Sequence, residues 1–455
     1  MDDIIIKWQP GKIFLGDFRD FVLVVQAAFM LRRNDMSCRR KHLQQCFVRI
    51  NQLVKLASFC VLLTLVIGAT DVVSKRTRYF VAPLEVLLHP NAFSFDQRKV
   101  ESSCTPVGEQ DMTVLITGSA GFIGFHVSKA LKAQGAGVLG LDNMNKYYPV
   151  VLKQARVTQL EKIGVYTLVA DLNDASSIRK ALDLCNFTHV LHLAAQAGVR
   201  YAVTNPLSYI HSNVAGTVTL FEQIIRTSPT PKVVFASSSS IYGINKNTPF
   251  SEDDVTDSPA SLYAATKKSD ELLGHTYNHI HGVSITALRF FTVYGPYGRP
   301  DMAYFSFTNN IAHGKPITIF QGEGGGELAR DFTHISDIVD GVIASLQTSE
   351  PSGKHADGSK PPFRVFNLGN RTPISVSEFV STLEKHLGRK AHRIYVPMPE
   401  TGDVPFTHAD VSKATLELGY NPKVSLDEGI KQFVEWYLSF CHGETCEDIK
   451  KYKPA

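Results

Sequence analysis

The sequence predicts an α/β protein built on a doubly wound parallel sheet, with a smaller C-terminal lobe and an N-terminal membrane anchor. Three observations lead to this prediction. An uncharged apolar run lies at 56–70, a strand pattern at 113–117 runs into a glycine-rich loop, and strand-like runs then alternate with helical segments. Strands that alternate with helices are typical of parallel sheets covered by helices on both faces.

The apolar run LASFCVLLTLVIGAT at 56–70 carries no charge, and Val72 and Val73 extend it. A bilayer core asks for about 20 apolar residues, so a buried helix and the apolar region of a cleaved signal peptide stay open as alternatives. Basic residues flank the run, with a modest excess on its N-terminal side. We expect a cytosolic segment at 1–55, a signal-anchor helix at 56–73 and a stem or linker at 74–111.

Charge and cysteine content narrow the function classes. The formal net charge is only +4 over 455 residues, and no basic stripe interleaved with aromatic residues is present, so we expect no nucleic-acid partner. The seven cysteines show neither a disulfide framework nor the spacing of a metal site. In the tail at 441–455, Cys441 and Cys446 could pair in an oxidising lumen, and free thiols are an equal alternative.

The glycine-rich loop GSAGFIG follows the strand pattern directly and leads into a helical segment. Its glycines permit a tight turn and let backbone N–H groups at the helix N-terminus approach a pyrophosphate. The loop alone is a weak signal, because its spacing differs from the G-x-G-x-x-G form. The residues that we expect to face the pyrophosphate are Gly118, Gly121, Phe122, Ile123 and Gly124.

A second strand, at 138–141, ends in Asp142, about 20 residues after the glycines. A carboxylate there would accept hydrogen bonds from an adenosine ribose and repel a 2′-phosphate, so NAD is preferred over NADP as the cofactor. The pattern predicts a Rossmann-type lobe at 112–290. Because parallel strands present their carboxyl ends at one edge, the next strand ends add candidate cofactor residues: Asn143, Asp171, Leu172, Ala194 and Ala195.

Tyr263 and Lys267 lie four residues apart, which places them on one face of a helix. An ammonium there favours ionisation of the phenol, which can then take a proton from a sugar hydroxyl. Such a pair often occurs by chance. Here it follows the glycine loop and a serine run at 237–240 that ends a buried strand, a position that a simple turn does not explain. The combination indicates a hydride-transfer enzyme.

From Thr113 to Tyr437 the chain resembles the plant UDP-glucuronate 4-epimerases, within the extended short-chain dehydrogenase/reductase superfamily. Departures from the family pattern are small: Ala170 where a glycine is common, Met144 where an aromatic residue is usual, and a glycine-rich loop at 322–326. The strings that carry the resemblance include LITGSAGFIG, GVLGLDN, FTHVLHLAAQAGVRYA, FASSSSIYG, PASLYAATKK, TYNHIHG, LRFFTVYGPYGRPDMAYF, ARDFTHISDIVDG, VFNLGN and GDVPFTHAD.

The resemblance implies an NAD-dependent isomerase that interconverts UDP-glucuronate and UDP-galacturonate through a 4-keto intermediate and supplies precursors of pectin and other cell-wall polysaccharides. Hydride would pass between sugar C4 and NAD. Tyr263 would be the acid/base, Lys267 would hold the nicotinamide ribose, and Ser238 would bind the oxygen at C4. It also implies a homodimer and a single-pass type II Golgi membrane protein with a luminal catalytic region.

Ser239 and Ser240 bear on which reaction is catalysed. Related 4,6-dehydratases have an Asp-Glu pair here, and UDP-glucuronate decarboxylases have a Glu at the place of Ser240. Neutral hydroxyls from these serines, and from Thr292 where UDP-galactose 4-epimerases commonly have Asn, could donate to a C5 carboxylate. Generic loop hydroxyls remain the alternative interpretation, and a decarboxylase, a UDP-galactose 4-epimerase and a non-catalytic NAD-binding protein remain the competing functions.

The UDP moiety would bind in the cleft between the NAD lobe and a substrate-binding lobe at 291–440, from which 332–346 and 364–368 return to the first lobe. A guanidinium can grip phosphate through two hydrogen bonds or stack on uracil. The candidates for this role are Arg200, Arg299 and Arg330.

Overall fold

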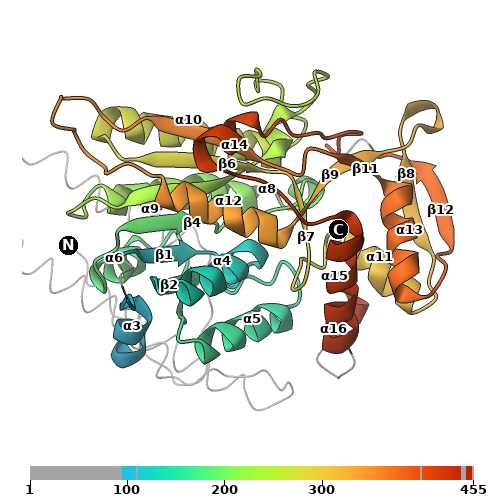
Figure 1. Ribbon diagram of the computed structural model, residues 1–455, viewed down its shortest axis with the longest axis horizontal. Coiled ribbons are helices and arrows are strands. Elements are labelled where there is room, and N and C mark those ends of the chain that lie inside the picture. Colours follow the sequence, from blue (N-terminus) through green and yellow to red (C-terminus); the bar gives the residue numbers. More distant parts are fainter. Residues whose placement is uncertain (1–94, 109–110, 400–401, 442–446, 453–455) are drawn as a thin grey trace, which may run out of the picture. The chain divides into compact units, whose positions relative to one another are not determined.

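The computed structural model describes residues 95–108, 111–399, 402–441 and 447–452 (Figure 1). The predicted cytosolic segment, the predicted anchor at 56–73 and most of the predicted stem lie outside the described residues. Within those four ranges, no helix is both long and apolar enough to cross a membrane.

A seven-stranded parallel sheet forms the centre of the larger lobe, with strand order β10-β6-β5-β4-β1-β2-β3. The chain enters at β1, proceeds to β3 at one edge and then continues from β4 on the other side of β1, so the sheet is doubly wound as the sequence predicts. Its strands are β1 Thr113–Thr117, β2 Gly137–Asp142, β3 Tyr166–Val169, β4 His189–His192, β5 Lys232–Ser238, β6 Ile285–Phe290 and β10 Phe363–Leu368.

Helices cover both faces of this sheet (Figure 1), which is why every residue of β1, β2 and β6 is buried. One face packs against a first group of helices: α4 Phe122–Ala133, α5 Val150–Lys162 and α12 Ile335–Gln347. The opposite face packs against a second group: α6 Ala175–Asp183, α9 Gly216–Ile224 and α10 Leu262–His281. Short helical segments join these elements: α7 Tyr201–Thr204, α8 Pro206–Tyr209, the π-helix η2 Ile210–Ala215 and the 3-10 helix η3 Ser239–Tyr242.

Two segments from the C-terminal half complete the larger lobe. β10 pairs with β6 at the edge of the sheet, and α12 packs against α4. Helix α12 and strand β10 thus lie with the larger lobe, whereas Phe332–His334 belong to β9 in the smaller lobe.

The smaller lobe holds two small sheets and its own apolar core. One sheet has the order β11-β9-β7, and the other pairs β8 with β12. Its strands are β7 Thr292–Tyr294, β8 Ile317–Gln321, β9 Ala329–His334, β11 Pro373–Ser375 and β12 Arg393–Pro397. Its helices, with those of the C-terminal segment, are α11 Ala303–Ala312, η4 Glu323–Gly325, α13 Val376–Leu387, α14 Ser412–Leu418, α15 Leu426–Phe440 and α16 Glu447–Lys451.

The end of the predicted linker is folded, which corrects the boundary at residue 111. Helix α3, Gln97–Cys104, packs against β2 and β3, and Cys104 forms a disulfide with Cys185, with 6.2 Å between their Cα atoms. The cysteine spacing did not indicate this pair, because the two cysteines are 81 residues apart and the packing of α3 brings them together. Cys441 is also disulfide-bonded, whereas Cys446 lies outside the described residues.

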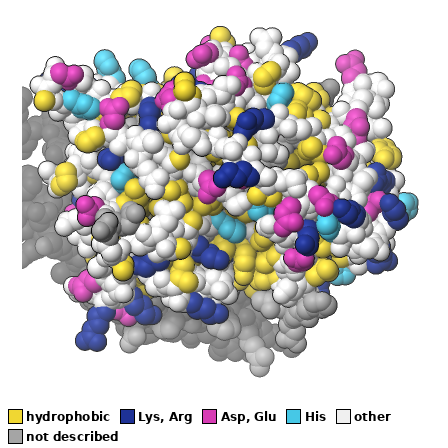
Figure 2. Space-filling view, in the orientation of Figure 1, with side chains coloured by type: hydrophobic (Ala, Val, Ile, Leu, Met, Phe, Trp, Pro, Cys, Tyr) yellow, Lys and Arg dark blue, Asp and Glu magenta, His cyan; other side chains and the backbone are white. Residues whose placement is uncertain are grey.

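Charges of both signs are mixed on the face of the molecule shown in Figure 2. Lys and Arg side chains alternate there with Asp and Glu side chains and do not gather into one basic band. The charged side chains on this face therefore form no continuous surface of one sign.

Candidate active site

One cavity of about 810 Å³ gathers every residue that the sequence nominates for the site. It lies where the carboxyl ends of the sheet strands meet the smaller lobe, the usual place for a ligand in this type of fold. The nominated residues that line it are Gly118, Gly121, Phe122, Ile123, Gly124, Asp142, Asn143, Asp171, Leu172, Ala194, Ala195, Arg200, Ser238, Ser239, Ser240, Tyr263, Lys267, Thr292, Arg299 and Arg330.

The glycine loop between β1 and α4 is shaped for close approach by a ligand. Gly118 has a φ of +75°, and a Cβ on it would lie 2.7 Å from the backbone nitrogen of Ala194, so a larger residue would not fit. Helix α4 begins at Phe122, and its N-cap, Gly121, has no side chain to bond the first N–H groups. Those groups are thus left for an anionic ligand, and the loop fits the pyrophosphate of NAD.

Asp142, at the end of β2, is paired with a lysine that sequence reasoning did not single out. Its Oδ1 accepts hydrogen bonds from Lys153 Nζ (3.0 Å) and from the Met144 N–H (2.8 Å), and its Oδ2 accepts from the Ala120 N–H (3.2 Å). The side chains of Asp142 and Lys153 are only 5% and 9% exposed. The carboxylate is therefore largely neutralised by a buried cation beside the place where a ribose would bind.

Asp171, just after β3, is held in place by its neighbours. It accepts hydrogen bonds from Asn143 Nδ2 (2.9 Å), from the Asn173 N–H (2.9 Å) and from His211 Nε2 (3.1 Å). Burial would raise the pKa of Asp171, but the hydrogen bonds from Asn143 and Asn173 outweigh burial and lower it. Asp171 is thus a charged acceptor at the adenosine end of the cavity.

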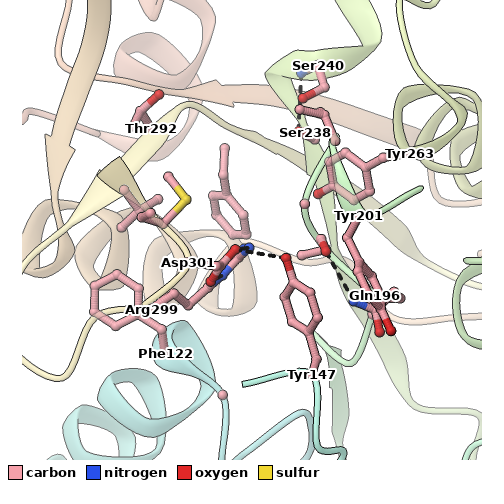
Figure 3. A pocket seen from close by; sticks show the side chains of 18 of the residues that line it. Phe122, Tyr147, Gln196, Tyr201, Ser238, Ser240, Tyr263, Thr292, Arg299 and Asp301 are labelled. Atoms are coloured by element: carbon pink, nitrogen blue, oxygen red, sulfur yellow. Dashed lines mark hydrogen bonds and ion pairs between the residues drawn. The ribbon is translucent and has the colours of Figure 1, made fainter. Parts of the chain in front are cut away.

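The serine run and the catalytic helix meet on one side of the cavity. Ser238 is the last residue of β5, its Oγ accepts from the Ser240 N–H (3.2 Å), and it caps η3. Helix α10 begins one residue before Tyr263 and is capped by Ser261, whose Oγ accepts from the Ala264 N–H (3.1 Å). Figure 3 shows the Tyr263 ring beside Ser238, both facing the cavity.

Lys267 lies one turn further along α10 and is 3% exposed. Its Nζ forms an ion pair of 2.9 Å with Asp270, which is 1% exposed. Burial by itself would lower the pKa of Lys267, but Asp270 and then Tyr263 outweigh burial and raise it. The ion pair therefore favours the charged form of the lysine beside Tyr263.

A buried ion pair fixes α10 against the sheet. Arg289 on β6 donates to both carboxylate oxygens of Glu271, with Nε–Oε1 of 3.0 Å and Nη2–Oε2 of 2.9 Å. Ser237 Oγ donates to the same carboxylate (2.6 Å), and Arg289 Nη1 donates to the hydroxyl of Tyr242 (3.0 Å). These contacts hold the end of β5 and the catalytic helix in one register.

The three arginines nominated for the UDP moiety face carboxylates or carbonyls that the sequence did not indicate. Arg299 Nε donates to Asp301 Oδ1 (3.0 Å), and Tyr147 donates to Asp301 Oδ2 (3.1 Å; Figure 3). Burial, and then the charge of Asp301, raise the pKa of Tyr147 above its ordinary value, so the phenol stays a donor.

Arg200 and Arg330 share one acidic neighbour. Arg200 Nε donates to Asp403 Oδ2 (2.7 Å), and its guanidinium lies over the Phe320 ring at 4.6 Å from the centroid. Arg330 donates to the Pro405 carbonyl (2.8 Å); burial and Arg200 lower its pKa, while Asp403 opposes this. Two guanidiniums near one carboxylate leave an excess of positive charge, which suits a diphosphate.

Among the described residues, no group of three or more His, Cys, Asp and Glu side chains could hold a metal ion.

Comparisons with known proteins agree with this geometry. The family model described as GDP-mannose 4,6 dehydratase matches residues 115–433. UDP-glucuronate 4-epimerase 1 of Arabidopsis thaliana is 50% identical over 411 residues, which cover 89% of this chain and 93% of that protein. UDP-glucuronate 4-epimerase 4 of the same plant is 56% identical over 335 residues, which cover 73% and 77% of the two chains.

A solved structure shares the fold. The crystal structure of UDP-glucuronic acid 4-epimerase from Bacillus cereus, in complex with UDP-glucuronic acid and NAD, aligns with a TM-score of 0.65 and 34% sequence identity. The alignment covers 72% of this chain and 99% of that one. The chain therefore belongs to this family of NAD-dependent nucleotide-sugar epimerases and dehydratases, and within it to the UDP-glucuronate 4-epimerases.

Proposed function

We propose that this chain interconverts UDP-glucuronate and UDP-galacturonate by inverting sugar C4 through a 4-keto intermediate, with NAD as its cofactor. One observation carries the proposal. Tyr263, Lys267 and Ser238 converge in the same cavity as the glycine loop and a set of neutral hydroxyls. The proposal is also supported by relatives that are UDP-glucuronate 4-epimerases and by a similar structure that contains UDP-glucuronic acid and NAD.

Bound NAD supplies a reversible hydride acceptor. Tyr263 removes the proton of the 4-hydroxyl as hydride leaves C4, and the positive charge of Lys267 favours the phenolate. Ser238 donates a hydrogen bond to the oxygen at C4, where negative charge develops. After the 4-keto sugar rotates in the site, Tyr263 returns the proton. Each residue therefore ends the reaction in the protonation state in which it began.

Neutral hydroxyls at the C5 end favour epimerisation over elimination or decarboxylation. Although the matching family model is described as a dehydratase, Ser239 and Ser240 offer no carboxylate that could take part in an elimination. Both serines and Thr292 are half-buried and line the cavity, so their hydroxyls can donate to a carboxylate. The 4-keto intermediate is a β-keto acid, which loses CO₂ when its carboxylate bond aligns with the carbonyl π system. Hydrogen bonds that hold the carboxylate out of that alignment would protect it.

We further propose that the protein is a homodimer. Large apolar side chains are exposed on α7, α8 and α10, which lie close to Tyr263: Val203 (68%), Leu207 (76%) and Leu272 (58%). A second copy that covers these helices would bury them.

Sedimentation of Leu207→Asp should then give a monomer, and an unchanged mass would contradict this interface.

The location that we propose is the Golgi membrane, with a single type II anchor at 56–73 and a luminal catalytic region. The uncharged run and its basic flank support the anchor. The Cys104–Cys185 disulfide supports the lumen, because disulfides persist in oxidising compartments.

If the anchor crosses the bilayer, carbonate extraction of membranes that contain the full chain should leave it in the pellet, and external protease should trim only the N-terminal segment. Release of the intact chain by carbonate would contradict the anchor. Loss of the catalytic region to protease in sealed vesicles would contradict its luminal orientation.

Tyr263→Phe should retain binding of NAD and UDP-glucuronate but lower kcat by about 10²–10⁴-fold, because only the proton-transfer group is lost. Turnover is measured by separating the two UDP-sugars, and binding by calorimetry. Near-normal turnover would show that another group moves the proton.

Asp142→Ala should weaken NAD binding about tenfold or more and raise the relative affinity for NADP, because Lys153 then becomes an unpaired cation beside the ribose site. Calorimetric Kd values for both nucleotides measure the preference. Asp142→Ala combined with Lys153→Met is the matched control and should lose the gain toward NADP. An equal gain in the double variant would mean that Lys153 does not bind the 2′-phosphate.

Ser240→Ala combined with Thr292→Ala should lower epimerisation and raise the share of CO₂ and UDP-4-keto-pentose among the products. Hydrogen bonds to a charged group contribute about 1.5–3 kcal/mol each, enough to change the partition about tenfold. Release of labelled CO₂ from carboxyl-labelled UDP-glucuronate is the measurement. Weaker binding with no extra CO₂ per turnover would reduce these hydroxyls to ordinary substrate contacts.

A further inference from the structure

The Lys267 ammonium lines the cavity and also contacts a carboxylate that does not line it, that of Asp270. Its ion pair with Asp270 (2.9 Å) joins two side chains that are 4% and 1% exposed. Within the described part of the chain, the other oxygen of this carboxylate, Oδ1, has no hydrogen-bond partner. Burial raises the pKa of the Asp270 carboxyl and Lys267 opposes this, so the charged form of Asp270 depends on the ion pair.

The surroundings of this pair are otherwise nearly neutral. Thr217 on α9 lies beside the Asp270 carboxylate and bonds His192 Nε2 on β4 (3.1 Å). Burial, and then the charge on Lys267, lower the pKa of His192 to about 3, so this histidine is uncharged at neutral pH. Thr117 Oγ1 occupies its other ring nitrogen (2.8 Å).

The remaining charged groups nearby are already matched. Glu271, the next residue on α10, is neutralised by Arg289 from β6 through two hydrogen bonds. Besides Asp270, the Lys267 ammonium faces Tyr263 and this Glu271 carboxylate. The local charge therefore depends on one cation, Lys267, shared between the Asp270 carboxylate and the Tyr263 phenol.

We propose that Asp270 is a positioning residue for the reaction: it keeps Lys267 charged and fixed while Tyr263 alternates between its protonated and ionised forms. A lysine that is buried without Asp270 would tend to lose its proton, and the phenolate would lose its counter-charge. Asp270 therefore sets the pH above which Lys267 loses its charge.

The sign of the effect follows from electrostatics. An anion favours the protonated form of any titrating neighbour, whether that neighbour is a lysine or a tyrosine. Asp270→Asn removes the charge with little change of shape. The alkaline limb of the pH profile of kcat/KM, which reports loss of the Lys267 proton, should therefore move to lower pH by about 1–3 units.

The pH profiles of the full-length wild type, Asp270→Asn and Asp337→Asn provide the test, with UDP-glucuronate as substrate. Asp337 is the matched control, because it is also buried (3% exposed) but accepts from the Lys423 and Val424 backbone N–H groups instead of from a lysine side chain. Its substitution should leave both limbs in place. If the limbs of the pH profile also stay in place in Asp270→Asn, the proposal is overturned, even if the variant loses activity.

A stability cycle tests the same pair without turnover. Lys267→Met leaves the Asp270 carboxylate buried and unpaired, so adding Asp270→Asn to it should raise the melting temperature by about 2 °C or more. The cycle also decides the matter if Asp270→Asn alone fails to fold. A double variant that melts no higher than Lys267→Met would mean that Asp270 does not act through Lys267.

Discussion

The ion pair between Glu271 and Arg289 is the contact on which the catalytic geometry depends. It is buried and bidentate, and it joins α10 to β6 beside the end of β5. A buried ion pair adds little net stability over a well-packed apolar pair, but removing one partner costs about 3–5 kcal/mol. The ion pair matters here because it fixes the position of α10. Glu271 lies eight residues after Tyr263, so a fixed Glu271 fixes the tyrosine about 12 Å away along the helix.

Hydrogen bonds connect this ion pair to the C-terminal half of the chain. The Tyr242 hydroxyl accepts from Arg289 and donates to Asn367 Oδ1 (2.7 Å) on β10. Asn367 Nδ2 in turn donates to the carbonyls of Phe250 (2.9 Å) and Asp410 (3.0 Å). Because β10 comes from the C-terminal half, its place in the sheet depends on polar contacts as well as on strand pairing. The serine run, the catalytic helix and the later loops are thereby joined by one buried network.

Much of this architecture was predictable because it is local or periodic. Buried strands, the glycine loop and the Tyr263–Lys267 spacing each occupy a few consecutive residues, and the parallel sheet then brings their ends together. The counter-charges were not predictable. Asp403 and its partner Arg200 are 203 residues apart, and a lone aspartate in a loop carries no pattern. Lys153 looked like one of many helical lysines, and only its burial beside Asp142 distinguishes it.

The pairing of charges explains how the cavity could orient a UDP-sugar. Lys153, Lys267 and Arg299 each face a carboxylate of their own, so their fields are largely balanced before any ligand binds. Arg200 and Arg330 share Asp403, and this end of the cavity is therefore the most favourable place for a diphosphate. The proposed carboxylate end offers only neutral hydroxyls, which can bind a sugar acid but compete poorly for the more highly charged diphosphate. A substrate bound in the reverse orientation would place its diphosphate among those hydroxyls, and the guanidiniums of Arg200 and Arg330 would have no diphosphate to bind. The charge distribution by itself therefore favours the orientation that brings C4 to Tyr263.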